Sequence, residues 1–262
     1  MFNCQLKVFG IIPARYASTR FPGKPLALLG SIAMVEWVFR QASKAFDTVV
    51  VATDDERIAD VVRRFGGNAL MTSPDHCSGT DRCAEALELM QKQTGTKADV
   101  VVNIQGDEPF IDPDLLTRLA ACFDDETTQI ATVVKPFENV ADLFNPNNVK
   151  VVISNANRAI YFSRSPIPYI RGIKQDEWLN SNNFYWHLGL YAYRADVLNR
   201  LTLLQPSSLE KAESLEQNRW IENDFCIRII KTVGENIAVD TPDDLVKAQQ
   251  WLEKNQKSRF ND

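Results

Sequence analysis

Short apolar runs alternate with longer segments of helical periodicity in the first half of the chain. The apolar runs have the length and composition of strands buried in a parallel sheet, and they cover residues 7–12, 48–52, 69–72 and 99–104. The segments that follow them repeat apolar residues at helical spacing, over residues 31–46, 54–65 and 80–93 and from Pro113 onward. Four strand–helix units in succession predict a parallel sheet with helices on both faces.

The second half of the chain has a different rhythm. Residues 149–153 and 158–163 flank a short polar turn and predict a β-hairpin, whereas residues 165–183 have the composition of a loop. We expect three further strands, over residues 186–193, 227–231 and 237–239.

Two helices of the second half carry clear start signals. Ser207 and Glu210 have the spacing of a capping box, which opens a helix that runs to about residue 222. Thr241 is a cap for the last helix, because a proline follows it at the first helical position. No repeat and no linker separates these elements. We therefore expect one domain over residues 1–262, with a hairpin and loop lobe at about residues 145–185.

Composition narrows the class of protein. The chain is 45% hydrophobic and 24% charged, with a formal net charge of −5, which is typical of a globular protein and disfavours a nucleic acid or an anionic membrane as partner. No apolar run approaches the ~18 residues that a membrane-spanning helix needs, and the N-terminus lacks the pattern of a signal peptide. Five cysteines without a CxxC pair predict free thiols and a cytoplasmic location, and two histidines are too few for a zinc site.

Ligands of open parallel sheets bind beyond the carboxyl ends of the strands. Here that rule selects the four loops that follow the predicted strands, at residues 13–25, 53–55, 72–80 and 105–109. The first of them carries three cations, Arg15, Arg20 and Lys24. Fixed cations and backbone N–H groups in a turn suit a triphosphate, although neither the P-loop nor the GxGxxG pattern is present. The alternative is a solvated basic loop.

Two aspartates are candidate metal ligands. Asp107 follows the strand of residues 99–104 beside a glycine, and Asp240 follows the strand expected at residues 237–239. Both therefore end strands at the same rim, and their carboxylates suit a Mg²⁺ ion bound jointly with phosphate oxygens. The alternatives are a turn cap for Asp107 and ordinary helix capping for Asp240.

Several blocks of sequence, in order and at characteristic intervals, resemble those of one enzyme family. The blocks are PARYASTRFPGKPLA, VATDDERI, SGTDR, VVNIQGDEPFI, NPNNVKVV, AIYFSRSPIP, HLGLYAYR, LEQNR and VDTPDDL. Together they resemble the 3-deoxy-D-manno-octulosonate cytidylyltransferases, also called CMP-Kdo synthetases, of lipopolysaccharide synthesis. Kdo is the abbreviation of 3-deoxy-D-manno-octulosonate, a sugar acid. The resemblance runs from about Lys7 to Leu252, nearly the whole chain.

The resemblance implies a fold, a reaction and an assembly. The fold is α/β and Rossmann-like, a glycosyltransferase-A-type nucleotidyltransferase with a mixed, mostly parallel sheet and a small β-hairpin lobe. The reaction is CTP + Kdo → CMP-Kdo + pyrophosphate with Mg²⁺ as cofactor, so the partners are CTP and a 2-keto-3-deoxy sugar acid. The family also implies a homodimer.

The resemblance further assigns site residues to positions of this chain. The implied catalytic residues are Arg15, Lys24, Asp107 and Asp240, of which the two aspartates hold the metal. The nucleotide would be bound by Ala14, Arg15, Arg20, Lys24, Ala52, Thr53, Asp54, Ser78, Gly79, Thr80 and Arg82. The sugar acid would be bound by Gln105, Arg164, His187, Tyr191, Glu216 and Gln217.

Some of these positions have structural alternatives. Thr53 and Asp54 also suit a helix cap, and His187 on a predicted strand suits a hydrogen-bonded core imidazole. His76, outside the assigned set, is expected at the surface of the loop rim.

The chain departs from the family pattern at a few points. Residues 31–33 replace a usual Lys-Pro pair before Met34, Asp81 replaces a glutamate, and Asn218 replaces a leucine ahead of an unusual stretch at 219–225. That stretch leaves the sugar acid open, so a related acid such as 8-amino-Kdo or a sialic-type sugar is an alternative substrate. A CTP-binding module without catalysis is the non-enzymatic alternative. A sugar-1-phosphate nucleotidyltransferase is disfavoured because its glycine-rich first loop is missing.

Overall fold

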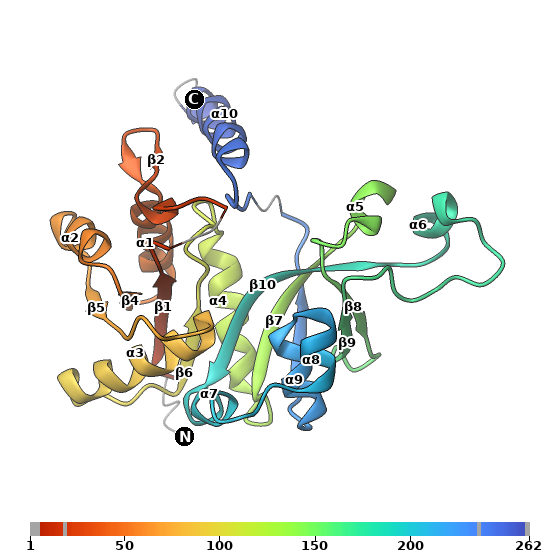
Figure 1. Cartoon of the computed structure of the whole chain (residues 1–262), viewed down its shortest axis with the longest axis horizontal. Coiled ribbons are helices and arrows are strands. Elements are labelled where there is room, and N and C mark those ends of the chain that lie inside the picture. Colours follow the sequence, from red (N-terminus) through yellow and green to blue (C-terminus); the bar gives the residue numbers. More distant parts are fainter. Residues whose placement is uncertain (1–5, 18–19, 235–236, 260–262) are drawn as a thin grey trace. The chain divides into compact units, whose positions relative to one another are not determined.

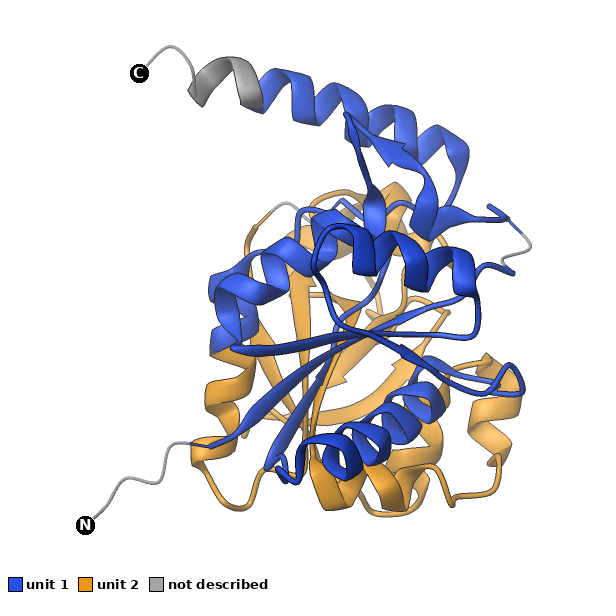
Figure 2. Cartoon of the chain, turned by 90° about the vertical axis from the view of Figure 1, so that its left-hand side faces the viewer, with its two compact units in different colours: residues 1–117, 235–262 blue, residues 118–234 orange. Residues whose placement is uncertain are grey.

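A computed structural model describes residues 6–17, 20–234 and 237–259 of the chain. The chain divides into two compact units, one of residues 1–117 and 235–262 and the other of residues 118–234 (Figure 2). The boundary falls inside helix α4 (Pro113–Ala121), so no linker or change of composition marks it in the sequence. The expectation of a single domain stays a prediction, and each unit is described below on its own.

The first unit contains a parallel sheet of four strands, labelled in Figure 1. Its strands are β1 (Val8–Ala14), β4 (Thr48–Thr53), β5 (Ala69–Met71) and β6 (Val100–Asn103). They lie in the order β6–β1–β4–β5, and every neighbouring pair is parallel. These are the four strands expected from the apolar runs, and burial of nearly all their residues explains why those runs lack polar alternation.

Helices of the first unit pack against this sheet. The helices that contact its strands are α1 (Met34–Ala45), α2 (Glu56–Arg64) and α3 (Gly79–Thr94), and the unit also contains α10 (Pro242–Arg259) and the start of α4. All were expected, but the prediction that the first helix begins at residue 31 is wrong. Ile32–Ala33 forms β3, which pairs with β2 (Leu28–Leu29) in a separate two-stranded antiparallel sheet.

The segment that leads into α10 is held by the core rather than by a strand ladder. Val239 is fully buried in a cluster with Leu29, Met34 and Leu252. The strand expected at residues 237–239 is therefore wrong, because these residues pair with no strand. A backbone hydrogen bond from the N–H of Val239 to the carbonyl of Asp107 sets the position of Asp240.

The second unit contains a mixed sheet. Its strands are β7 (Ile130–Pro136), β8 (Lys150–Ile153), β9 (Ala159–Ser163), β10 (Tyr185–Arg194) and β11 (Ile227–Lys231). β7 pairs with β11 in parallel and with β10 in antiparallel orientation, and β10, β8 and β9 continue antiparallel. The expected hairpin and the strands β10 and β11 are confirmed, whereas β7 was not expected.

Short helices connect these strands. They are α5 (Val140–Phe144), the 3-10 helix η3 (Gln175–Glu177), α6 (Trp178–Ser181), α7 (Ala195–Leu201), α8 (Ser208–Glu213) and α9 (Glu216–Glu222). The capping box of Ser207 and Glu210 is confirmed. The prediction of one helix to residue 222 is wrong, because Ser214 takes a left-handed conformation with φ +51° and separates α8 from α9.

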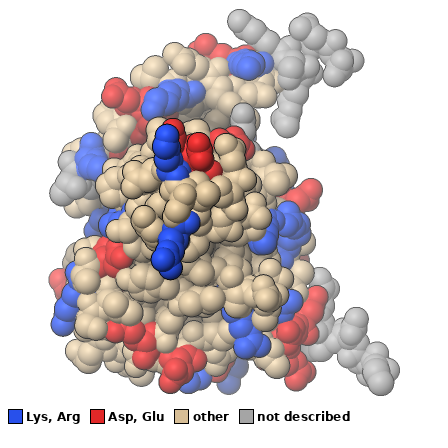
Figure 3. Space-filling view, turned by 90° about the vertical axis from the view of Figure 1, so that its right-hand side faces the viewer, with Lys and Arg blue, Asp and Glu red and all other residues tan. Residues whose placement is uncertain are grey.

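The described residues contain no helix long and apolar enough to cross a membrane. On the face of the molecule that Figure 3 shows, Lys and Arg side chains are interspersed with Asp and Glu. This mixture accords with the modest net charge of −5.

Candidate active site

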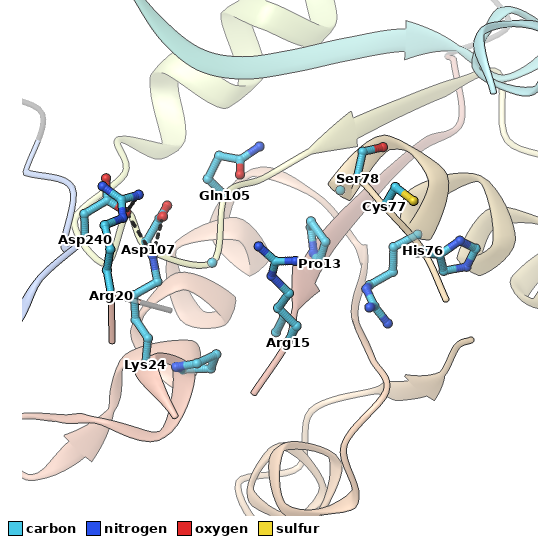
Figure 4. Close-up of a pocket in the computed structure, with 15 residues that line it drawn as sticks. Pro13, Arg15, Arg20, Lys24, His76, Cys77, Ser78, Gln105, Asp107 and Asp240 are labelled. Atoms are coloured by element: carbon cyan, nitrogen blue, oxygen red, sulfur yellow. Dashed lines mark hydrogen bonds and ion pairs between the residues drawn. The ribbon is translucent and has the colours of Figure 1, made fainter. Parts of the chain in front are cut away.

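A cavity of about 270 Å³ opens in the first unit beyond the carboxyl ends of β1 and β6. Ten of the residues expected to bind substrates or metal line it: Ala14, Arg15, Arg20, Lys24, Ser78, Gly79, Arg82, Gln105, Asp107 and Asp240. Figure 4 shows the acidic side chains at one end of this cavity, the Ser78 segment at the other, and Arg15 between them. Three of the four loops selected by the strand-end rule, those at residues 13–25, 72–80 and 105–109, thus meet around one hollow.

Two carboxylates converge on one lysine at the acidic end. Lys24 Nζ lies 2.7 Å from Asp107 Oδ2 and 3.2 Å from Asp240 Oδ1, and Arg20 reaches the same Asp240 oxygen at 3.1 Å (Figure 4). The Lys24 side chain is only 16% exposed, so water screens these contacts less than it screens surface pairs. The expected proximity of the two aspartates is therefore observed, with a positive charge between them.

Backbone contacts bring the two aspartates together. The N–H of Val239 donates to the carbonyl oxygen of Asp107 at 2.8 Å, and Asp240 follows directly. Gly106 permits the approach of the Asp107 loop to the end of β1, because a Cβ at this position would lie 3.1 Å from the backbone oxygen of Pro13. A larger residue would require the two backbone segments to separate by a few tenths of an ångström.

Lys24 is presented by a closed turn. The N–H of Gly23 donates to the carbonyl oxygen of Tyr16 at 2.9 Å, and Lys24 begins the 3-10 helix η1 (Lys24–Leu26). Gly23 adopts φ +72°, a conformation that other residues rarely take. The turn fixes the point at which the loop of residues 13–25, called the cationic loop below, re-enters regular structure.

The opposite end of the cavity is the N-terminus of α3. Ser78 caps this helix, and with Asp81 it forms a complete capping box. The helix dipole and the N–H groups of the first turn favour negative charge here, as a phosphate would supply.

Arg82, a residue of α3, holds two loops together behind this end. The residue is 3% exposed, and its guanidinium donates to Asp54 Oδ2 at 2.9 Å, to Thr72 Oγ1 at 2.6 Å and to the Ser73 carbonyl at 3.3 Å. These hydrogen bonds hold the Asp54 loop and the Thr72–Ser73 loop against α3.

Four residues assigned to the nucleotide do not line the cavity: Ala52, Thr53, Asp54 and Thr80. Thr53 and Thr80 are buried, and Thr53 Oγ1 accepts the N–H of Asp55. The alternative that Thr53 or Asp54 caps the next helix is wrong, because the N-cap of α2 is Asp55, whose side chain accepts from the N–H of Arg57.

His76 and Cys77 line the cavity although the sequence did not assign them to it. His76 lies at the loop rim as expected but is partly buried: its side chain is 20% exposed, and Nε2 lies 2.5 Å from Glu85 Oε2. Burial acts to raise the pKa of Glu85, but hydrogen bonds from the Ser73 N–H and from His76 outweigh it and hold the pKa below its usual value. The available signal for both residues was their position one and two residues before Ser78.

The candidate sugar residues other than Gln105 belong to the second unit. Arg164 is braced there by the main chain: its Nε donates to the carbonyl of Glu213 at 2.7 Å, and its other nitrogens donate to the carbonyls of Pro146 and Ser214. Glu213 in turn accepts from the N–H of Arg164 at 2.9 Å. A guanidinium has five N–H groups, so these three bonds orient it without exhausting it.

His187 and Tyr191 lie in an aromatic cluster of the second unit. The Thr132 hydroxyl donates to the carbonyl of Leu190 at 2.6 Å, so its oxygen accepts from His187 Nε2, 3.0 Å away. Burial lowers the pKa of His187 to about 3, which keeps the imidazole neutral. The hydrogen-bonded core imidazole is thus what the structure contains. Among the described residues the buried hydroxyl of Tyr191 has no hydrogen-bond partner.

The start of α9 carries the remaining candidates. Glu216 forms an ion pair with Arg219 at 2.9 Å, and Gln217 is buried. Asn218, the residue that departs from the family pattern, is fully buried and binds one strand residue twice. Its Nδ2 donates to the carbonyl of Phe162 at 3.0 Å, and its Oδ1 accepts the N–H of the same residue at 3.3 Å.

Comparison with known proteins identifies the family of this chain. A model of the cytidylyltransferase family matches residues 9–232. The 3-deoxy-manno-octulosonate cytidylyltransferase of Parabacteroides distasonis is 55% identical over 94% of this chain and 98% of the relative, and that of Bacteroides thetaiotaomicron is 53% identical with the same coverage.

A solved structure of CMP:2-keto-3-deoxy-manno-octonic acid synthetase complexed with CTP superposes with a TM-score of 0.86, at 39% identity, over 95% of this chain and 99% of that one. The expected α/β nucleotidyltransferase fold is thereby confirmed. The matches span nearly the full length of both partners. The chain therefore belongs to the cytidylyltransferase family, among the 3-deoxy-manno-octulosonate cytidylyltransferases.

Proposed function

We propose that this protein transfers the cytidylyl group of CTP to 3-deoxy-D-manno-octulosonate, which yields CMP-Kdo and pyrophosphate. The relatives at 53–55% identity carry the name of this activity, and the neighbouring solved structure is complexed with CTP. The observation that carries the proposal is the convergence of Asp107 and Asp240 on Lys24, in a cavity that also contains Arg15 and Arg20. Two acids and three cations in one hollow suit a triphosphate and its metal.

The reaction is an in-line displacement at phosphorus. The anomeric hydroxyl of the sugar acid loses its proton, its oxygen bonds to the α-phosphorus, and the bond from that phosphorus to the bridging oxygen of the β-phosphate breaks. The protein contributes position and charge rather than covalent chemistry. In this proposal Arg15, Arg20 and Lys24 hold the triphosphate and neutralise the leaving pyrophosphate, and the N-terminus of α3 favours phosphate at the other end.

The residues present fit a Mg²⁺ ion. Among the described residues no three His, Cys, Asp or Glu side chains form a metal cluster, but Mg²⁺ in nucleotide sites needs only one or two carboxylates besides phosphate oxygens and water. Asp107 and Asp240 already converge on a single cationic nitrogen, which marks their midpoint as a place for positive charge. These two residues would hold the ion, which when bound supplies positive charge to the phosphates and the attacking oxygen.

For the sugar acid we propose the residues that the family resemblance assigns, Gln105, Arg164, His187, Tyr191, Glu216 and Gln217. Gln105 lines the cavity of the first unit. Arg164 supports a carboxylate contact because its braced guanidinium keeps N–H groups beyond the three already used. The unpartnered buried hydroxyl of Tyr191 supports a polar contact with a bound molecule.

We further propose a homodimer in the cytoplasm that serves lipopolysaccharide synthesis. The family resemblance supports the assembly and the pathway. The cysteines support a reducing compartment, because Cys77, Cys83, Cys122 and Cys226 are free thiols, while Cys4 lies outside the described residues. Light scattering coupled to size-exclusion chromatography tests the dimer directly: a mass of 29.6 kDa would contradict it.

A pyrophosphate-release assay tests the activity. CTP, Kdo and Mg²⁺ are expected to give steady release, whereas UTP, ATP or GTP in place of CTP, or EDTA, should abolish most of it. Parallel reactions with 8-amino-Kdo and N-acetylneuraminic acid distinguish the substrate alternatives. CTP binding without pyrophosphate release from any acid would identify a nucleotide-binding module and refute the proposed activity.

A further inference from the structure

Tyr16, in the cationic loop of the first unit, lies under an arginine from helix α2. The guanidinium carbon of Arg57 lies 3.4 Å from the centroid of the Tyr16 ring, which is close contact for a stacked cation. Tyr16 directly follows Arg15 in sequence, and neither Tyr16 nor Arg57 lines the cavity. The stacked pair therefore acts on the site through the loop.

Arg57 is itself held in one orientation. Its Nε and one terminal nitrogen donate to the two oxygens of Asp55, at 2.9 and 2.6 Å, and its N–H donates to the same side chain at 3.0 Å. These hydrogen bonds hold the pKa of Asp55 below its usual value. Asp55 is the N-cap of α2 and follows the Thr53–Asp54 segment at the end of β4. The flat face of the guanidinium is thus fixed relative to a strand end.

Tyr16 also closes the loop. Its carbonyl oxygen accepts the N–H of Gly23 at 2.9 Å, and a Cβ on Gly23 would lie 3.1 Å from the Tyr16 ring. Lys24 follows Gly23 and reaches both Asp107 and Asp240. The ring of Tyr16 is therefore packed between the start of α2 and the turn that presents Lys24.

We propose that Arg57 is a positioning residue for the nucleotide: by stacking on Tyr16 it fixes the loop that carries Arg15 and Lys24 against the end of β4. Its role in CTP binding rests on the proposed function. The Arg57 guanidinium lines no part of the cavity and does not contact Asp107 or Asp240, so it acts only through the position of the loop. Because that loop carries the cations for the triphosphate, removal of Arg57 should weaken nucleotide binding and leave binding of the sugar acid unchanged.

The same helix provides a matched control. Arg63 is also an exposed arginine of α2, 50% exposed against 60% for Arg57, and it also forms acidic pairs, with Glu56 and Asp60. The hydrogen bonds and ion pairs that the Arg63 side chain makes with the described residues stay within α2. The effect of removing a positive charge from α2 can therefore be measured with Arg63→Ala, separately from the effect of removing the stack.

The test compares Arg57→Ala, Tyr16→Leu, their double variant, Tyr16→Phe and Arg63→Ala. We expect Arg57→Ala and Tyr16→Leu each to raise the KM and the Kd for CTP about five-fold, with the KM for Kdo unchanged. The double variant should bind CTP no more weakly than the weaker-binding single variant, because the two substitutions remove the same contact. Tyr16→Phe keeps the ring and Arg63→Ala keeps the stack, so both should bind CTP as the wild type does.

Hydrogen exchange at the Gly23 amide gives a readout that does not depend on catalysis. Arg57→Ala and Tyr16→Leu should speed this exchange several-fold, and Arg63→Ala should not. Multiplicative effects in the double variant, equal effects on the KM of both substrates, or an Arg57→Ala variant that matches Arg63→Ala would each overturn the proposal. If the wild type fails to bind CTP, the proposed function fails, and unchanged Gly23 exchange in Arg57→Ala would then refute the loop contact by itself.

Discussion

The backbone N–H of Val239 donates to the carbonyl oxygen of Asp107 across 2.8 Å, and this bond joins two segments that are far apart in the sequence. Because Val239 is fully buried among Leu29, Met34 and Leu252, its neighbour Asp240 is carried to the cavity on a fixed support. The acidic end of the site therefore depends on the packing of the last helix as well as on its own side chains.

Removal of either acidic charge should impair turnover. Asp107→Asn and Asp240→Asn keep the size of the side chain but remove the charge that would hold Mg²⁺. We expect each to lower kcat by about 100-fold or more, measured by pyrophosphate release at saturating CTP and Mg²⁺. Asp243→Asn is the control, because Asp243 is an exposed residue in the first turn of α10 and does not line the cavity. Wild-type turnover in Asp107→Asn would rule out the metal role.

The buried pair of Arg82 and Asp54 should matter for stability. Arg82→Met leaves the Asp54 carboxylate, 17% exposed, without its cation, and leaves the Thr72 hydroxyl and the Ser73 carbonyl without their donor. We expect the free energy of unfolding in urea to fall by about 3 kcal/mol. The double variant Arg82→Met/Asp54→Asn should recover part of that loss because no unpaired charge remains. A single variant as stable as the wild type would show that the pair contributes nothing.

His187 should make the protein sensitive to acid. Its pKa is about 3 in the folded protein and about 6.5 when unfolded, so between these values the unfolded state binds the proton and stability falls as pH falls. Between pH 7.5 and pH 5 this group should cost about 2 kcal/mol of unfolding free energy. Urea unfolding of wild type and His187→Gln at both pH values measures the cost: the variant should lose about 2 kcal/mol less. Equal losses would mean that the imidazole titrates normally.

Asn218 should be a structural residue in this chain. Replacement by leucine, the usual residue of the family, leaves the buried N–H and carbonyl of Phe162 without the two bonds of 3.3 and 3.0 Å. We expect Asn218→Leu to lose about 2 kcal/mol of unfolding free energy, since unpaired buried backbone groups keep their full desolvation cost. Asn199→Leu, at an exposed position of α7, should be nearly neutral. An Asn218→Leu protein of unchanged stability would mean that the strand finds other partners.

Local periodicity predicted most of the elements but not the meetings between them. The buried strands, the hairpin and the capping box at Ser207 follow from spacing alone, because burial and capping leave a local record in the sequence. β7 was missed although Ile130–Val134 is buried, because the expected alternation of strands and helices stopped at α4, one strand short of the structure. The break at Ser214 was missed because a serine in a left-handed conformation carries no signal of its own.

The candidate site shows the same division. Arg15, Arg20, Lys24 and Asp107 are recognisable because they follow strands whose ends meet in any parallel sheet. The stack of Arg57 on Tyr16 and the pair of His76 with Glu85 are not, because each joins side chains whose contact depends on the exact path of two loops. Motifs thus identify the groups, and only tertiary structure reveals what orients them.

Lys24 stands between two carboxylates, and this has a thermodynamic consequence. The Lys24 ammonium neutralises the two carboxylates. A divalent ion that binds there must compete with this charge, whose local concentration is fixed because it belongs to the same chain. If the phosphates of a bound nucleotide attract the Lys24 ammonium, it leaves its position between Asp107 and Asp240. The two carboxylates then repel each other without a cation between them. Metal and nucleotide should then enter with positive cooperativity, each improving the affinity for the other.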